Sequence, residues 1–170
     1  ALEERRKLLV VQSSELKEKN EKILSAHEEI LSVNEELTVL NEAISKQKDE
    51  MLDSITYAKK IQAAMLPPEQ YFQEVLNDVF ILFKPRDIVS GDFFWVKHVN
   101  QYVVLAAADC TGHGVPGAFM SMLGMSYLNE IVHRREITQA NQVLNELRKQ
   151  IRNSLRQHGQ PEESKDGIDM

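Results

Sequence analysis

Asp92 and Asp109 are the residues of this chain whose types and spacing most clearly indicate chemistry. Apolar runs on both sides of Asn100-Gln101 predict an antiparallel β-hairpin, and a turn centred between those two residues places Asp92 directly opposite Asp109. Residues opposite each other in a hairpin have Cβ atoms about 5 Å apart, where like charges are destabilising. Two ionised carboxylates beside apolar strands therefore need either a shared proton or a cation.

Oxygen ligands without a histidine or thiolate partner favour a hard cation, Mg²⁺ or Mn²⁺. The alternative is that each aspartate ends a strand and accepts hydrogen bonds from loop amides. The spacing by itself leaves both interpretations open.

Glycines are concentrated around both aspartates. Gly91 directly precedes Asp92, while Gly112 and Gly114 follow Asp109 in the turn before a predicted helix. Glycine lets a backbone pass close to an ion or a phosphate, and a helix N-terminus favours anions. We interpret these three as the glycines of a metal loop, although an ordinary strand-to-helix turn is the plainer alternative.

Two further residues of this loop invite chemical interpretation. Cys110 would suggest a cysteine phosphatase, but that chemistry needs an arginine six residues later to hold the phosphate, and Pro116 stands there. His113 has the chemistry to donate a proton to a leaving group. A surface position, or a supporting position behind the ligands, is the other interpretation of His113.

Composition excludes several classes of function. The net charge of −6 and the lack of a basic patch argue against nucleic-acid binding. A single cysteine cannot form an internal disulfide, which predicts a reducing compartment, the cytoplasm. No stretch of the sequence has the length and apolar composition expected of a membrane span. Because the chain starts at Ala1 rather than methionine, we expect a piece of a longer protein, which leaves open that it is the cytoplasmic part of a larger sensor.

The first 66 residues contain neither proline nor glycine and predict one long helix. Apolar residues recur in it every seven positions, a period typical of a left-handed coiled coil. This heptad column consists of Leu2, Leu9, Leu16, Ile23, Ile30, Leu37, Ile44 and Met51. Because one helix cannot bury its own seam, we expect a parallel homodimer through residues 1–66, with a solvated single helix or an antiparallel hairpin as alternatives.

After Met51 the apolar spacing changes to that of an ordinary amphipathic helix. Its members are Met51, Ile55, Ala58, Ile61 and Met65, with Leu52 and Leu66 beside them. The wider face predicts packing against the next domain as well as against the partner helix, with a coiled coil of wider apolar seam as the alternative.

Pro67-Pro68 predicts the end of the long helix and the start of a second domain, residues 67–170. Here we expect a short helix at 69–77, strands at 79–83, 93–98 and 102–108, and a helix from Pro116 to His133. A last helix begins at a Thr138 cap and ends before Gly159. This order predicts an α+β fold, and three strands offer too little sheet to cover its apolar faces.

Three segments carry a resemblance to a known family. They are residues 84–95 (KPRDIVSGDFFW), residues 107–118 (AADCTGHGVPGA) and residues 55–67 (ITYAKKIQAAMLP). Together they resemble the first two motifs, and the entering helix, of SpoIIE/RsbU-type serine phosphatases. These are the bacterial branch of the metal-dependent protein phosphatases (PPM), and the likeness covers roughly residues 46–170. It implies a β-sandwich flanked by helices, of which this chain holds the N-terminal part behind a coiled-coil linker.

The resemblance also implies a site and an activity. Two Mn²⁺ or Mg²⁺ ions would bind Asp92, Asp109 and the main-chain carbonyl of Cys110. No catalytic side chain is implied beyond a metal-bound water, which attacks phosphorus without a phospho-enzyme. Arg86 is a candidate to hold the substrate phosphate, with a surface role as its alternative. The implied substrate is a phosphoserine or phosphothreonine protein, such as an anti-anti-sigma (STAS) protein, with control through the helical linker.

The sequence departs from this family at its end. Residues 165–170 (KDGIDM) match the start of the strand after which the remaining acidic ligands lie, so Asp166 and Asp169 are not implied as ligands. We therefore expect this chain to bind Mn²⁺ weakly and to have little phosphatase activity. The alternative function is a non-catalytic coiled-coil dimerisation module with a degenerate phosphatase-like domain. A nucleotide cyclase is suggested only by the short run 91–94, and it has no place for the Asp109 loop.

Overall fold

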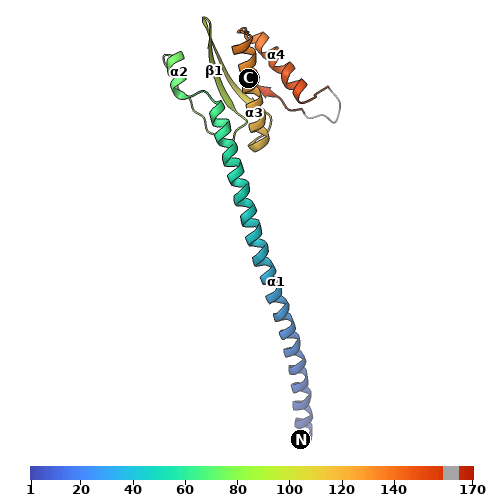
Figure 1. Ribbon diagram of the computed structural model, residues 1–170. Helices are drawn as coiled ribbons and strands as arrows, with labels where there is room; N and C mark the ends of the chain where they lie inside the picture. The colour runs from blue at the N-terminus through green and yellow to red at the C-terminus, as the bar shows by residue number, and fades with distance from the viewer. Residues whose placement is uncertain (159–164) are drawn as a thin grey trace. The chain divides into compact units, whose positions relative to one another are not determined.

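The computed structural model describes residues 1–158 and 165–170. The chain forms two compact units, Ala1–Met51 and Leu52–Met170. Figure 1 shows the long helix α1 (Leu2–Met65, 64 residues), which contributes to both units. No helix of the described part of the chain is long and apolar enough to cross a membrane.

The first unit consists of α1 as far as Met51. Every residue in it is exposed, including the whole heptad column, whose exposed fractions run from 87% at Leu2 to 49% at Leu37. The leucine and isoleucine side chains of this column are exposed to solvent, and no other element of the unit packs against them. Burial of the seam therefore requires another helix.

The second unit begins with the last turns of α1. Ile55, Ala58 and Met65 are half-buried here, as the widened apolar face predicted. Ile61, which was expected on the same face, is 47% exposed, and the buried residue is its neighbour Gln62. After Pro67-Pro68 the short helix α2 (Glu69–Val75) buries Phe72.

The sheet contains three antiparallel strands in the order β1-β2-β3. Strands β1 (Phe93–Val99) and β2 (Tyr102–Cys110) form the predicted hairpin, and their pairing from Val99↔Tyr102 to Phe93↔Ala108 confirms the predicted register. Asn100 turns the chain with a positive φ of 54°, a conformation that asparagine tolerates better than most residues. The two-residue strand β3 (Ile168–Asp169) pairs with the end of β2.

The strand predicted at 79–83 is wrong. This segment has no regular secondary structure and pairs with no strand of the described residues, and it leaves Phe80 84% and Leu82 69% exposed. A short apolar run forms a strand only where a neighbouring strand pairs with its backbone groups. Of the two phenylalanines in this segment, Phe83 is the one with a ring partner. Its ring packs edge to face against that of Phe94, with 5.4 Å between the ring centroids.

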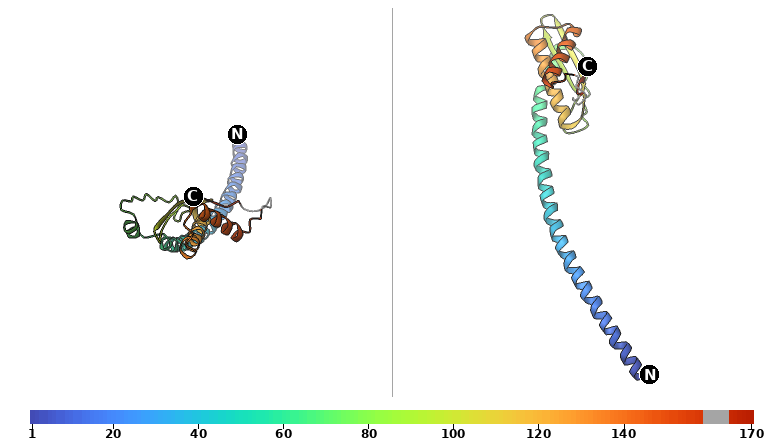
Figure 2. Two further views of the ribbon diagram at one scale, coloured as in Figure 1. Left: turned by 90° about the horizontal axis from the view of Figure 1, so that it is seen from above. Right: turned by 90° about the vertical axis from the view of Figure 1, so that its right-hand side faces the viewer.

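Three helical elements follow the hairpin and lie beside it (Figures 1 and 2): α3 (Gly114–Leu128), a π-helical continuation η1 (Asn129–Arg134) and α4 (Ala140–Ser154). The N-cap of α4 is Gln139 rather than Thr138, and Leu144, predicted on its inner face, is 43% exposed. Gly159, expected beyond its end, lies outside the described residues.

The core of the second unit lies between the hairpin and these helices. Its central members are Phe93, Trp95, Met125, Leu128, Ile131, Val132, Val143, Leu147 and Ile151, each no more than 5% exposed. A long N-terminal helix, a small antiparallel sheet and further helices make the fold α+β, as predicted. This packing fixes the position of the hairpin end that carries the two aspartates.

Candidate metal centre

The end of the hairpin brings the two aspartates together. Asp92 directly precedes β1, and Asp109 is the penultimate residue of β2. The two aspartates therefore occupy the next position along the hairpin beyond its last pair, Phe93↔Ala108. Side chains alternate between the two faces of a strand. In β2, Ala106, Ala108 and Cys110 face the core, which leaves Asp109 on the exposed face.

The carboxyl group of Asp92 does not titrate like an isolated one. Partial burial raises its pKa first, and a hydrogen bond with the Asp109 carboxylate, then the negative charge of Asp109, raise it further. When Asp92 is protonated, it is the donor of that hydrogen bond and the Asp109 carboxylate is the acceptor. A raised pKa is the direction expected for two facing carboxyl groups, and a divalent cation could take the place of the proton.

The sulfur of Cys110 is not available as a ligand, so the group of this residue that could serve the site is its backbone carbonyl. The side chain is 3% exposed, and burial, followed by the charges of Asp109 and Asp92, raises the thiol pKa to about 12. The thiol thus stays protonated and is no nucleophile at neutral pH. The main-chain oxygen of Cys110 instead faces Gly91, since a Cβ added to Gly91 would lie 3.2 Å from it.

The glycines let the two aspartate-bearing segments touch. A Cβ added to Gly91 would lie 2.8 Å from the carbonyl oxygen of Gly112, and one added to Gly117 would lie 2.7 Å from the same oxygen. Both distances are too short for any side chain. Gly112 and Gly114 also have positive φ angles of 89° and 61°, which glycine adopts without strain. The backbone before Asp92 and the backbone after Asp109 are consequently in direct contact.

Gln62 was missed by sequence reasoning. Its side chain is 5% exposed, and Nε2 donates to the carbonyl oxygen of Ser90 at 2.6 Å and to Oγ of Ser121 at 2.8 Å. Ser90 N–H donates back to Oε1 of Gln62 at 3.0 Å. The end of α1 is thereby fixed to the segment that leads into Asp92 and to helix α3. The sequence signal was a glutamine in register with the apolar face of Ile55 and Ala58.

The last described residues pair with the end of β2 and with the loop that follows Asp109. β3 pairs Asp169 with Asp109, and Thr111 exchanges two hydrogen bonds of 3.0 Å with the backbone of Gly167. Asp169 therefore comes from a strand that borders the aspartate pair. Within residues 1–158 and 165–170, however, no group of three or more histidine, cysteine, aspartate or glutamate side chains is arranged to hold a metal ion. The donors that this chain supplies are two carboxylates and neighbouring carbonyl groups, a set suited to a hard cation.

His113 and Arg86 lie outside the aspartate pair. His113 is the N-cap of α3, and its Nδ1 lies 3.0 Å from Oδ2 of Asp87. This contact, which the sequence did not predict, links the loop after Asp109 to the segment before Asp92. With side-chain exposed fractions of 67% and 39%, His113 and Asp87 are both accessible to solvent. Arg86, next to Asp87, is also exposed.

Comparison with solved structures gives the chemical context of this site. The chain is similar to the SiaA-PP2C domain of Pseudomonas aeruginosa, with 34% sequence identity and a TM-score of 0.58. The match covers 64% of this chain and 44% of that chain, so it spans less than half of the PP2C structure. No family model matches the chain, and no curated protein does. The likeness supports a phosphatase-type domain in the part of the chain that carries the two aspartates.

Proposed function

We propose that the intact protein is a metal-dependent protein serine/threonine phosphatase of the SpoIIE/RsbU type. In this proposal the chain contributes a signalling helix and the first part of the catalytic domain. The observation that carries it is the Asp92–Asp109 pair, whose carboxyl groups the hairpin holds within hydrogen-bond reach. The likeness to a PP2C domain gives that pair its chemical context.

Asp92, Asp109 and the carbonyl oxygen of Cys110 would hold Mn²⁺ or Mg²⁺. Such ions, when bound, activate water and neutralise charge on a phosphoryl group. The remaining residues have supporting roles. The glycine contact between Gly91 and Gly112 keeps the two ligand-bearing segments at a fixed spacing. Arg86 is the proposed contact for the substrate phosphate, since its guanidinium can bind two oxygens at once.

His113 is proposed to serve the same site from its edge. Asp87 holds Nδ1 and so orients the ring, which leaves Nε2 as the atom that could give a proton to a leaving group. The cytoplasm is the proposed location. The proposed substrate is a phosphorylated STAS-type regulatory protein, whose phosphoserine or phosphothreonine must reach the exposed side of the aspartate pair.

Control is proposed to act through α1. The exposed heptad column supports a homodimer through residues 1–66, in which a signal would turn the helix or shift its register. The physical link at the end of the helix is Gln62, because rotation of that turn would move Nε2 and Oε1 away from Ser90, two residues before Asp92. Polar substitutions at Ile44 and Met51 should therefore change the activity of the intact protein or its response to signal. Unchanged turnover and unchanged regulation would contradict this part of the proposal.

The catalytic proposal is tested by phosphate release from a phosphorylated STAS-domain protein, with and without Mn²⁺. The intact protein should release phosphate only with metal, and Asp92→Asn or Asp109→Asn should lower the rate by at least about a hundredfold, the scale of a lost catalytic group. Asp78→Asn, an exposed carboxylate outside the site, is the matched control. Activity that survives in both site variants would contradict the proposal. A protein with no activity that nevertheless dimerises would instead support the non-catalytic module.

A further inference from the structure

The outer face of α4 forms a pocket of about 330 Å³ that the phosphatase proposal does not use. Its walls include Asn145, Arg148, Lys149, Arg152 and Asn153, which fall on one side of the helix, and Gln157 just beyond its end. All charged side chains that line this pocket are cationic or, in the case of His158, able to become so. In a chain of net charge −6, such a local reversal of sign is unexpected for a merely solvated helix face.

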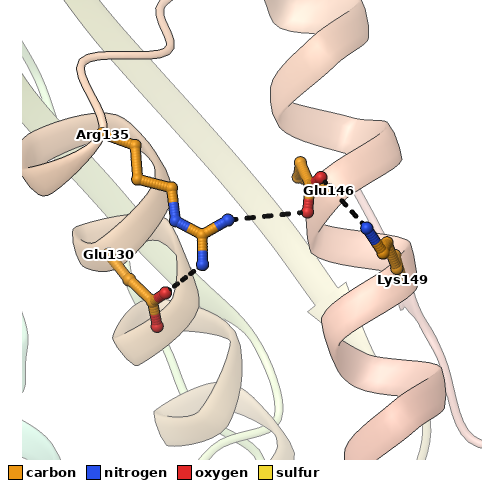
Figure 3. Close-up of polar contacts among 4 residues, drawn as sticks. All are labelled: Glu130, Arg135, Glu146 and Lys149. Carbon is orange, nitrogen blue, oxygen red and sulfur yellow. Dashed lines mark hydrogen bonds and ion pairs between the residues drawn. The ribbon is translucent and has the colours of Figure 1, made fainter.

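The cationic side chains of this pocket differ in whether a carboxylate already pairs with them. Lys149 lies 3.5 Å from Glu146, which also faces Arg135 at 3.8 Å, and Arg135 in turn pairs with Glu130 (Figure 3). These four residues neutralise one another. Arg148 has no hydrogen-bond or ion-pair partner among the described residues, and Arg152 donates only to the carbonyl oxygen of Gln157, at 3.3 Å. Within residues 1–158 and 165–170, neither of these two arginines is paired with a carboxylate.

We infer that this pocket binds a small polyanion with two neighbouring phosphate groups, and that the ligand is sensed at the loop of Asp109. Arg148 and Arg152 are four residues apart, so both guanidinium groups project from the same side of the helix and can each bind two oxygens. Asn145, Asn153 and Gln157 add amide donors. The C-terminal dipole of α4 opposes an anion with only about half an elementary charge, against two full charges from the arginines.

A chain of hydrogen bonds leads from this pocket to the candidate metal centre. Gln157, whose carbonyl accepts from Arg152, donates through Nε2 to the carbonyl oxygen of Asp166 at 2.9 Å. The next residue, Gly167, exchanges two hydrogen bonds with Thr111, and Asp169 pairs with Asp109. An anion that draws Arg152 and Gln157 toward itself would disturb the hydrogen bond between Gln157 and Asp166, and with it the position of Gly167. Binding itself does not depend on the proposed phosphatase function.

The test is calorimetric titration of the 170-residue chain with pyrophosphate, in buffer freed of divalent metal so that the aspartate pair cannot recruit the probe. We expect saturable binding that is tighter than that of inorganic phosphate. Arg148→Gln with Arg152→Gln should weaken it at least about tenfold, because charge-assisted hydrogen bonds are lost. The matched control, Arg5→Gln with Arg6→Gln, removes the same charge from the exposed start of α1 and should change the affinity less than about twofold.

A conservative variant separates charge from geometry. Arg148→Lys with Arg152→Lys keeps both charges but loses the planar fork, so its affinity should fall between those of the wild type and the glutamine variant. Backbone amide NMR signals of Gly167 and Thr111 should shift in proportion to pocket occupancy in the wild type. The inference is overturned if pyrophosphate does not bind saturably, if the control pair weakens binding as much as the pocket pair, or if those two signals do not move.

Discussion

The side-chain amide of Gln62 and the backbone of Ser90 are joined by reciprocal hydrogen bonds, of 2.6 Å from Nε2 to the Ser90 carbonyl oxygen and of 3.0 Å from Ser90 N–H to Oε1. Ser121 Oγ completes the cluster, because its one O–H lies within hydrogen-bond reach of the carbonyl oxygens of both Ser90 and Ala118. All of these polar groups are buried, and each is satisfied by another member of the cluster. The end of α1 therefore holds the segment before Asp92 by specific polar contacts.

Removal of this amide should destabilise the second unit. Gln62→Ala leaves the buried N–H of Ser90 without its acceptor, and we expect a loss of about 1–3 kcal/mol in the free energy of unfolding, measured by urea denaturation. Gln47→Ala, at an exposed position of the same helix, should cost nothing measurable. Equal effects of the two substitutions would show that the cluster does not stabilise the fold.

The Asp92–Asp109 pair predicts a pH dependence of stability in metal-free solution. Because folding raises the pKa of Asp92, this group stabilises the fold while it is protonated and loses that contribution as the pH rises through the raised value. Asp92→Asn removes the penalty. The melting temperature of this variant relative to the wild type should therefore rise from about pH 4 to pH 7, by a few degrees.

The control for this measurement is Asp78→Asn, which changes an exposed carboxylate in a loop. Its melting temperature should follow that of the wild type at each pH. A constant difference between Asp92→Asn and the wild type across the same range would mean that folding does not raise the pKa of Asp92.

The heptad column predicts the oligomeric state. The 170-residue chain should be a dimer by light scattering after gel filtration, and Ile23→Lys with Ile30→Lys should make it a monomer, because each subunit would bury two charges in the seam. Ser25→Lys with Ser32→Lys adds the same charge on an exposed side away from the column and should leave the dimer intact. A wild-type chain that is monomeric at micromolar concentration would refute the coiled-coil interpretation.

Cys110 should be inert in the folded chain. A thiol pKa of about 12 leaves about one molecule in ten thousand ionised at pH 8, and the side chain is 3% exposed. Reaction with iodoacetamide should thus be slow in buffer and fast in denaturant. The variant Cys110→Ala with Ser32→Cys, which carries one exposed thiol, should react fast in both. Rapid alkylation of the native wild type would contradict the burial of this side chain.

The sequence predicted those features that local patterns determine. A turn at Asn100-Gln101 and two apolar runs were enough to give the pairing of Phe93 with Ala108, since hairpin register follows from turn position. The strand predicted at 79–83 failed because a short apolar run says nothing about whether a neighbouring strand exists to pair with it. Local pattern therefore gave the hairpin but could not supply a partner strand for an isolated apolar segment.

The polar contacts around the site could not be predicted in the same way. Gln62 binds residues 28 and 59 positions away, and His113 meets Asp87 across 26 positions. A glutamine or histidine in a charged helix or a loop is ordinarily solvated, so nothing in its neighbours along the sequence marks it as paired. Only the packing of α1, the hairpin and α3 brings these partners together.

The most direct test of the central claim is Mn²⁺ binding by the 170-residue chain, followed by electron paramagnetic resonance of the free ion. The wild type should bind Mn²⁺ weakly but saturably, and Asp92→Asn and Asp109→Asn should each abolish binding, while Asp78→Asn binds as the wild type does. The same chain should release little phosphate from a phosphoserine protein. Absence of saturable binding by the wild type, or binding that survives both site substitutions, would contradict the assignment of this aspartate pair as a metal centre.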